Sequence, residues 1–175
     1  MSSVWDERPE EPTQDRIMGK MVAFPRRTRS YGFDYKYTGQ TQVAHPLTEA
    51  PALVREAFAA LTKVPTLEGH NAVLLNWYDA ELGEYMGAHS DDERDLVPCA
   101  PVLSLSWCSD SHYRRFRFTP RPGVHDALTP VWDGSSKMPG VLNLRDGCLV
   151  VMGGFCQATH KHELLKTRRK EPEEG

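Results

Sequence analysis

Ala72-Val-Leu-Leu-Asn-Trp-Tyr78 is the first of several short apolar stretches that together decide the fold class. Similar stretches follow at residues 102–107, 115–119 and 148–152, separated by clusters of Gly, Pro, Asp and Ser. Runs of this length, rich in β-branched and aromatic residues and bounded by turn formers, are typical of β-strands. They do not alternate with helical patterns, so βαβ units are not expected. This part of the chain therefore predicts an antiparallel sandwich or barrel.

One helix is predicted upstream of these strands. Thr48 can cap its beginning, and a set of apolar residues recurs at helical spacing after it. A helix followed by many short strands is the pattern of an α+β domain. The apolar set is Leu53, Val54, Ala57, Phe58 and Leu61.

The first forty residues contain a leader and a strand pattern. Residues 1–20 are acidic, contain prolines and lack periodicity, so we expect a loose leader, with one domain over residues 21–175. Four aromatic residues then alternate with smaller or polar ones, which predicts a strand with period 2. They are Tyr31, Phe33, Tyr35 and Tyr37.

Composition limits the class of protein. The 175 residues are 39% hydrophobic and 26% charged, which favours one globular domain over disorder. A net charge of −3 excludes a uniformly basic nucleic-acid coat. No apolar run approaches the roughly 18 residues that a membrane span needs. The four cysteines have no C-x-x-C spacing and are expected to be reduced thiols. We expect an intracellular monomer, nuclear or cytoplasmic, without membrane association.

A candidate metal site begins in Gly87-Ala-His-Ser-Asp-Asp-Glu93. His89 and Asp91 are two residues apart, and in an extended segment such side chains project to the same face. An imidazole and a carboxylate are two of the three ligands of the 2-His-1-carboxylate triad that leaves iron(II) with open positions. Taken alone, H-x-D is a weak signal, and the third ligand must come from a distant strand.

Two histidines are candidates for that third ligand. His160 and His162 follow the apolar strand predicted at residues 148–152. Because positions two apart on a strand share a face, alternation does not choose between them. Both alternatives stay open on the residues alone.

Five motifs, in order, give the chain a wider resemblance. They resemble the core of the AlkB family of iron(II)/2-oxoglutarate dioxygenases, and above all its double-stranded-DNA repair members. The likeness runs from residue 25 to about residue 170. The motifs are Pro25-Arg-Arg-Thr-Arg-Ser-Tyr-Gly32 with Tyr35-Lys-Tyr-Thr-Gly39; Leu74-Leu-Asn-Trp-Tyr78; Gly87-Ala-His-Ser-Asp-Asp-Glu-Arg94; Pro101-Val-Leu-Ser-Leu-Ser106; and Asp146-Gly-Cys-Leu-Val-Val-Met-Gly-Gly154 with Gln157-Ala-Thr-His-Lys-His-Glu-Leu-Leu-Lys-Thr167.

The resemblance implies a fold, a reaction and a set of roles. The fold would be a double-stranded β-helix (jelly-roll) core with a flanking N-terminal helix. Fe(II), O₂ and 2-oxoglutarate would serve oxidative dealkylation of bases such as 1-methyladenine or 3-methylcytosine, giving succinate, CO₂ and an aldehyde. The implied metal ligands are His89, Asp91 and His162. The implied 2-oxoglutarate contacts are Asn76 and Tyr78. The implied substrate contacts are Tyr31, Asp92 and Glu93.

One motif of the family has no counterpart here. The family closes with an arginine-rich strand, R-x-N-x-T-x-R, whose arginines pair with the 2-oxoglutarate carboxylates. After His162 this chain continues only to Lys166-Thr-Arg-Arg-Lys-Glu-Pro-Glu-Glu-Gly175. Pro172 opposes a central strand, so we expect the final core strand to be missing from this chain.

Three basic clusters suit contact with nucleic-acid phosphates, and the expected partner is alkylated DNA or RNA. Two alternatives remain: a nucleic-acid-binding module that keeps the fold without turnover, and a dioxygenase that acts on a protein side chain. The clusters are Arg26, Arg27 and Arg29; Arg114, Arg115 and Arg117; and Lys166, Arg168, Arg169 and Lys170.

Overall fold

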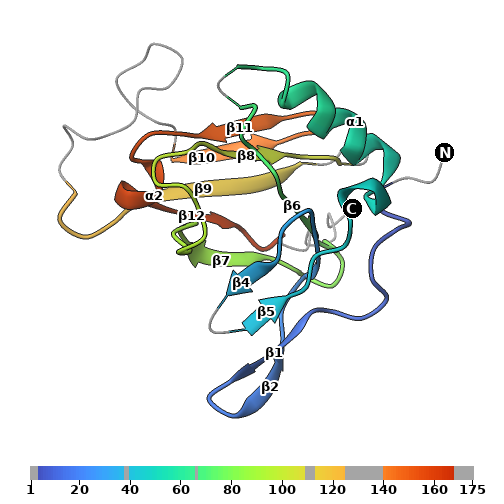
Figure 1. Ribbon diagram of the computed structural model, residues 1–175. Helices are drawn as coiled ribbons and strands as arrows, with labels where there is room; N and C mark the ends of the chain where they lie inside the picture. The colour runs from blue at the N-terminus through green and yellow to red at the C-terminus, as the bar shows by residue number, and fades with distance from the viewer. Residues whose placement is uncertain (1–3, 38–39, 66, 109–112, 125–139, 168–175) are drawn as a thin grey trace, which may run out of the picture. The chain divides into compact units, whose positions relative to one another are not determined.

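A computed structural model of the chain describes residues 4–37, 40–65, 67–108, 113–124 and 140–167 (Figure 1). The chain divides into two compact units, Met1–Asp79 and Ala80–Gly175. Antiparallel strands dominate the described residues, and the helices are few and short. This mostly β content agrees with the predicted class.

In the first unit, two paired strands form the centre. Strand β6 (Val73–Trp77) lies where an apolar strand was predicted and pairs with β3 (Arg27–Tyr31) in antiparallel register. Trp77 is buried, and its indole Nε1 donates a hydrogen bond of 2.7 Å to the carbonyl oxygen of Val4. This bond ties the beginning of the chain to the centre of the unit.

The single strand predicted through the alternating aromatics is wrong. Strand β3 ends at Tyr31, and β4 (Tyr35–Tyr37) pairs instead with β5 (Gln40–Gln42). Between them, Gly32 has a φ of +85°, and a Cβ there would collide with the backbone carbonyl oxygen of Asn71. Only glycine adopts this conformation at this close approach without strain, and it turns the chain away from the strand.

The helix begins later than predicted. Helix α1 (Ala52–Leu61) has Pro51 at its N-cap position, and Thr48 lies in a separate 3₁₀ helix, η1 (Leu47–Glu49). A residue before proline is disfavoured in the helical region, and Ala50 is accordingly extended, with ψ at 151°. The helix therefore does not run through from Thr48.

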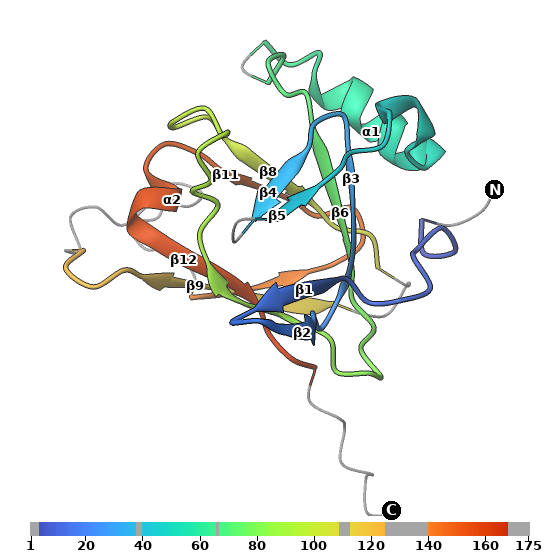
Figure 2. The same cartoon turned by 60° about the horizontal axis from the view of Figure 1, so that its bottom comes forward.

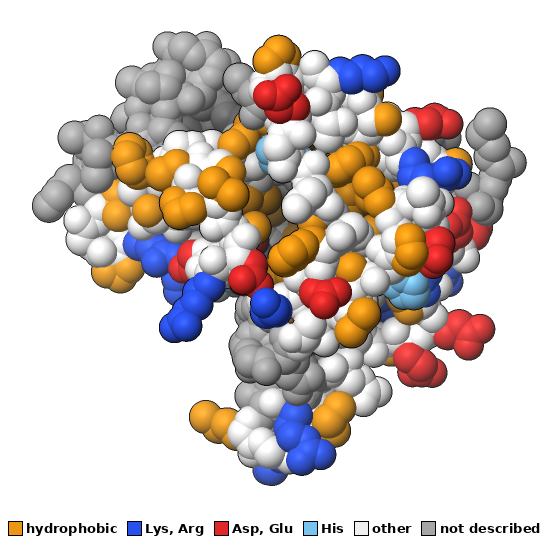
Figure 3. Space-filling model, viewed as in Figure 1, with side chains coloured by type: hydrophobic (Ala, Val, Ile, Leu, Met, Phe, Trp, Pro, Cys, Tyr) orange, Lys and Arg blue, Asp and Glu red, His pale blue; other side chains and the backbone are white. Residues whose placement is uncertain are grey.

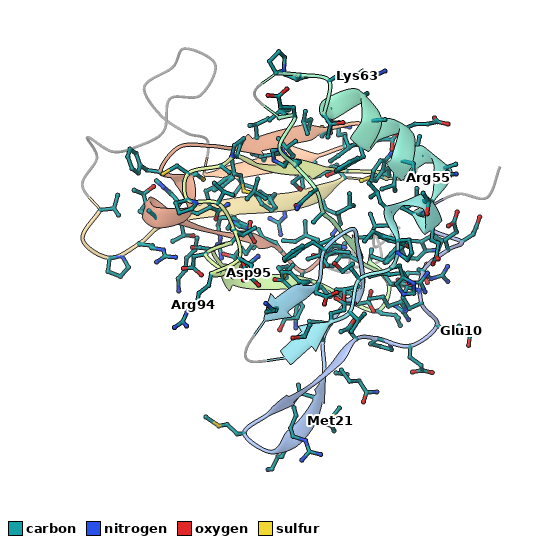
Figure 4. The ribbon with its side chains drawn as sticks, in the orientation of Figure 1. Glu10, Met21, Arg55, Lys63, Arg94 and Asp95 are labelled. Atoms are coloured by element: carbon teal, nitrogen blue, oxygen red, sulfur yellow. The ribbon has the colours of Figure 1, made fainter. Side chains whose placement is uncertain are left out.

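A β-hairpin was not predicted. Strands β1 (Gln14–Ile17) and β2 (Lys20–Ala23) pair through a tight turn, where Met18 and Gly19 have φ values of 51° and 82°. Part of this hairpin lies in the stretch expected to be a loose leader. Met18 is 99% exposed, and Met21 points outward from the hairpin (Figure 4). Hydrophobic and basic side chains stand side by side on the hairpin (Figure 3).

The second unit holds a four-stranded antiparallel sheet of order β10-β9-β12-β7 and a pair, β11-β8. Figures 1 and 2 both show β12 running between β9 and β7. Three of these strands lie where apolar strands were predicted, namely β8, β9 and β11. The elements of this unit are β7 (Met86–His89), β8 (Val102–Leu105), β9 (Arg114–Pro120), β10 (Val141–Leu144), β11 (Leu149–Met152), α2 (Cys156–Thr159) and β12 (His160–Leu164).

Strict alternation builds the core of this unit. On β9, Phe116 and Phe118 are buried while Arg115 and Arg117 between and beside them are exposed. On the neighbouring β12, His160, His162 and Leu164 are the buried set. The inner face of the sheet is thus aromatic and apolar apart from two histidines, which need polar partners.

All four cysteines are free, with Cys99 exposed and Cys108 and Cys148 half-buried. Cys156 is buried, and burial together with the charge of Asp91 raises the pKa of its thiol. None of the helices in the described part of the chain is long and apolar enough to cross a membrane.

Candidate metal centre

Antiparallel pairing brings the two halves of the candidate site together. Strand β12 pairs with β7, and His162 lies directly opposite His89, although the two are 73 positions apart in the sequence (162 − 89). The imidazole centroids are 4.2 Å apart, with the rings edge to face. Of the two histidines that alternation left open, the register thus places His162 opposite the H-x-D segment.

Asp91 completes a compact group. Its Oδ1 lies 3.6 Å from His89 Nε2, and its Oδ2 lies 3.5 Å from His162 Nε2. One ligand atom from each of the three residues lies within 4.8 Å of the others. Two imidazole nitrogens and a carboxylate oxygen at this spacing fit one divalent cation of the kind that binds mixed N/O ligands.

His160 has a different environment. Its side chain is 3% exposed, and its Nδ1 is 2.9 Å from the hydroxyl of Thr159. Burial lowers the pKa of His160, so this imidazole is neutral near pH 7. The residue therefore has a hydrogen-bonded place in the core beside the triad.

The protonation states suit a metal. Burial lowers the pKa of His162 to about 4, an effect that the Asp91 charge opposes. Burial alone would raise the pKa of Asp91, but the adjacent His89 and His162 imidazoles hold that pKa below the ordinary value. Near pH 7 the site therefore offers a neutral His162 and an ionised Asp91, the forms that ligate metals.

The orientation of each histidine has its own cause. His89 Nδ1 lies 2.9 Å from the carbonyl oxygen of Gly87, which favours a proton on Nδ1 and leaves the Nε2 lone pair for a ligand. His162 is held by aromatic rings: Phe116 stacks on it at 5.4 Å, and Phe118 lies 6.2 Å away. His162 Nδ1 is buried and has no hydrogen-bond partner among the described residues.

Two residues that the sequence did not single out hold the H-x-D loop in place: Ser90, which lies within the loop, and Gln157. Ser90 donates a hydrogen bond of 2.9 Å to the carbonyl oxygen of His160, and Gln157 contacts both the backbone and the carboxylate of Asp91. Gln157 lies in the last quoted motif, but nothing in its spacing distinguished it from its neighbours. Only the folded chain brings it to Asp91.

The two acidic residues that follow Asp91 have different environments. Asp92 is exposed and forms an ion pair of 2.7 Å with Arg121, whose Nε lies 3.3 Å from the Ser90 hydroxyl. Glu93 is half-buried in the turn that follows. Arg121 was not predicted, because it lies outside the quoted motifs and comes to the loop through the chain that follows β9.

Three further predicted site residues belong to the first unit. Asn76 lies on β6, and its Oδ1 is buried without a hydrogen-bond partner among the described residues. Tyr78 follows β6 and is half-buried. Tyr31 on β3 is the most buried large side chain, at 2% exposure, and its ring lies 5.8 Å from that of His45.

The basic clusters are partly used within the protein. Arg27 and Arg29 donate hydrogen bonds to carbonyl oxygens near the start of the chain, and Arg114 donates to the carbonyl oxygens of Glu84 and Leu165. Arg115 and Arg117 are exposed on the opposite face of β9 from Phe116 and Phe118, and Arg117 pairs with Glu163 at 2.8 Å. The third cluster lies outside the described residues except for Lys166, which stands 4.5 Å over the Tyr85 ring.

The triad and the strands that carry it define a class of metal-dependent oxygenase. The chain matches the family model of the 2OG-Fe(II) oxygenase superfamily over residues 5–175, and it belongs to that superfamily. Fe(II) and 2-oxoglutarate, the two cofactors expected from the motifs, are those that define the superfamily.

Particular relatives point further. The chain is similar to the DNA oxidative demethylase ALKBH2 of Mus musculus, with 31% identity over 104 residues, and to that of Homo sapiens, with 30% identity over 104 residues. The matches cover 57% of this chain but only 41% and 38% of the two relatives. The chain thus spans about two fifths of the length of these relatives. They confirm the resemblance to the AlkB family that the motifs indicated.

Proposed function

We propose that this protein removes N-alkyl groups from nucleobases by oxidation, with Fe(II), O₂ and 2-oxoglutarate, and that alkylated DNA is its substrate. The observation that carries the proposal is the triad of His89, Asp91 and His162, whose ligand atoms lie within 4.8 Å of one another. The printed function of the mouse and human relatives, DNA oxidative demethylase, supports the substrate class.

The three triad residues would hold the metal. Three protein ligands leave positions open for a co-substrate and dioxygen, which is the use of the 2-His-1-carboxylate arrangement. Bound iron(II) supplies the oxidising chemistry, in which 2-oxoglutarate is converted to succinate and CO₂ while the N-alkyl carbon is hydroxylated and leaves as an aldehyde. The residues of the chain would hold the reactants in place and limit the access of water to the site.

Asn76 and Tyr78 are the proposed 2-oxoglutarate contacts. The amide oxygen and nitrogen of asparagine exchange places on a flip of the side chain, so the unpaired buried position on Asn76 can also present an NH₂ group. An NH₂ donor and a phenol are suitable partners for a carboxylate. A buried polar atom without a partner is expensive, and a bound co-substrate would remove that cost.

Asp92 and Glu93 are the proposed contacts to the flipped base. The ion pair with Arg121 holds the Asp92 carboxylate at one end of the H-x-D loop, on the residue next to Asp91. Carboxylates accept hydrogen bonds from exocyclic amino groups, which adenine and cytosine carry on the pairing edge. Tyr31 was the third predicted contact, and its 2% exposure gives that role no support.

The base must leave the helix to react. An N-methyl group on the pairing edge is inaccessible within a duplex, and a lesion that already blocks pairing makes extrusion less costly.

We also propose the double-stranded β-helix as the fold, because the antiparallel pairs of the second unit are those that such a core requires. RNA as substrate, a monomeric state and a nuclear location remain predictions.

Turnover tests the function directly. Purified protein is incubated in air with Fe(II), 2-oxoglutarate and a duplex oligonucleotide with one 1-methyladenine, and succinate and the repaired base are measured by mass spectrometry. Succinate formed in step with demethylation supports the proposal. Binding of the oligonucleotide without turnover would instead support the binding module, and succinate formed only with a peptide substrate would support action on a side chain.

Ligand variants give the matched control. His162→Ala should lower turnover more than about 100-fold, since even residues that only support a metal ligand contribute 10- to 100-fold. Lys161→Ala, an exposed neighbour on the same strand, should leave turnover within about twofold. If His160→Ala abolishes turnover in a folded protein while His162→Ala does not, the assignment of the distal ligand is wrong.

A further inference from the structure

Gln157 has an environment that the triad alone does not explain. Its Oε1 accepts a hydrogen bond of 2.9 Å from the backbone N–H of Asp91, and its Nε2 donates one of 3.2 Å to Asp91 Oδ2. One amide therefore contacts the same aspartate at two points, one on the backbone and one on the carboxylate. With its amide held at both points, the Gln157 side chain is restricted to one rotamer.

The local structure explains how Gln157 reaches Asp91. It lies in α2, a single helical turn whose first and last residues, Cys156 and Thr159, are buried. The Thr159 hydroxyl donates a hydrogen bond of 2.8 Å back to the carbonyl oxygen of Phe155, which closes the turn. The Gln157 amide also packs against Met152, with its Nε2 at 3.8 Å from the sulfur. The amide is thus positioned by buried neighbours on both sides.

The two contacts distinguish the two carboxylate oxygens. Oδ2 receives the amide donor from Gln157 and lies toward His162, whereas Oδ1 lies toward His89 and receives nothing from that amide. A carboxylate oxygen that already accepts a hydrogen bond is a weaker metal ligand than the other oxygen of the same group. The arrangement favours attachment of a cation through one oxygen, which conserves open positions for other ligands.

A second link acts on the other side of the same loop. The Ser90 hydroxyl donates to the carbonyl oxygen of His160, so β12 and its preceding turn hold the H-x-D loop from both sides of Asp91. Supporting hydrogen bonds of this kind orient metal ligands and strengthen metal binding. Ser90 contacts the His160 carbonyl oxygen and the Arg121 side chain but no side chain of the triad, so Gln157 is the one of the two that acts on a ligand side chain.

We propose that Gln157 is a positioning residue that fixes the Asp91 carboxylate for one-oxygen ligation and so sets the affinity of the triad for its divalent metal. The inference rests on the metal-binding part of the proposed function and on nothing about the nucleic acid. It predicts that Gln157 affects metal binding in the absence of any substrate.

The test uses Co²⁺ alone as the probe, with the full chain first stripped of metal by a chelator. Affinity is measured by calorimetry, and the visible absorption of bound Co²⁺ reports the geometry of its ligands. Gln157→Met keeps the length of the side chain and removes both contacts. Its dissociation constant should rise about 10- to 100-fold, and the visible bands should change. Lys161→Met, the same replacement at an exposed position four residues later, should change neither.

Several outcomes are decisive. An affinity within twofold of the unsubstituted chain, with unchanged visible bands, overturns the inference. If Gln157→Met does not fold, as judged by circular dichroism without metal, Gln157→Asn is measured in its place. Its shorter amide does not span both points on Asp91, so a folded Gln157→Asn with full affinity overturns the inference equally. If the unsubstituted chain itself binds no Co²⁺, the metal site of the proposed function fails, which is a separate result.

Discussion

His162 shows at the level of one residue how burial prepares a ligand. The imidazole is enclosed by Phe116, Phe118 and His89, and its pKa falls to about 4. The surrounding rings exclude water, which is why the neutral form dominates far below the ordinary range of histidine. A neutral imidazole binds metal without first releasing a proton.

The same burial makes stability depend on pH. The unfolded chain binds a proton at this imidazole below about pH 6.5, whereas the folded chain does so only below about 4. The unfolded state therefore holds more protons in that window, and the free energy of unfolding of the metal-free protein should fall as pH is lowered from 6.5 to 4. The full contribution is about 3 kcal/mol. Below pH 4 this group should cause no further loss.

Urea unfolding in the presence of a chelator, at pH 7, 6, 5 and 4, measures the effect. His162→Gln removes the titrating group, so the difference between the two proteins isolates it from the other histidines. Asp91 acts in a lower window, because its lowered pKa contributes stability that is lost only below about pH 3.8. Parallel pH curves for the two proteins would show that His162 is not buried in the neutral form.

At the same scale, the sequence predicted the three triad residues but not the residues that contact them. The H-x-D spacing and the family motifs pointed to His89, Asp91 and His162, and the structure brings these three side chains together. Gln157 and Arg121 contact this loop from 66 and 29 or more residues away, and no periodicity expresses such contacts. Residues of this kind are found only after the strands are paired.

At the level of elements, Gly32 decides where β3 ends. It combines a φ of +85° with a close approach to the Asn71 carbonyl oxygen. Gly19 in the β1–β2 turn has almost the same φ, +82°, but nothing lies within 4 Å of the place where a Cβ would stand. The pair separates the two costs of adding a methyl group.

Gly19→Ala should lower the free energy of unfolding by about 1–2 kcal/mol, the cost of a left-handed conformation. Gly32→Ala should lower it by a further 1–3 kcal/mol or so, because the backbone must move to accept the methyl group. Both residues belong to the first unit, so denaturant unfolding compares them under the same conditions. Equal losses for the two variants would mean that the approach of Asn71 relaxes without cost.

Element prediction succeeded for the apolar strands that contribute to the core and failed where turns decide. Strands β6, β8, β9 and β11 lie within a residue or two of the apolar runs that predicted them. The alternating aromatics failed because the turn at Gly32 interrupts a pattern that would otherwise continue. The hairpin β1–β2 was missed because β2 is exposed along its whole length, so no buried face marks it in the sequence, and its pairing depends on the Met18–Gly19 turn.

At the level of the whole molecule, a chain of net charge −3 must meet a polyanion through local basic residues. Arg26 and Arg27 are half-buried at the start of β3, and Arg26 lies over the Phe24 ring, so part of each side chain serves packing. Arg115 and Arg117 face away from the buried side of their sheet that carries His162. Arg26 and Arg27 are therefore the pair to test for contacts with phosphates.

Replacement of Arg26 and Arg27 by Gln should weaken binding to every duplex sequence alike. It should also reduce the slope of log affinity against log salt by about 2, since each lost phosphate contact removes about 0.9. Fluorescence anisotropy between 50 and 200 mM salt measures both. The control replaces Arg55 and Lys63, exposed on and after α1 (Figure 4), and removes the same charge elsewhere. Identical slopes for the two double variants would show that the effect is one of net charge alone.

Strand β12 lies between β9 and β7, although it is the last strand of the described chain. During synthesis on the ribosome, β7 and β9 therefore emerge long before the strand that joins them, and neither can pair with β12 until residues 160–164 are released. His162 arrives with that strand, so the metal site does not exist in a growing chain. Metal can therefore bind at the triad only after β12 has been synthesised, and a nascent chain held short of residue 162 should remain free of metal.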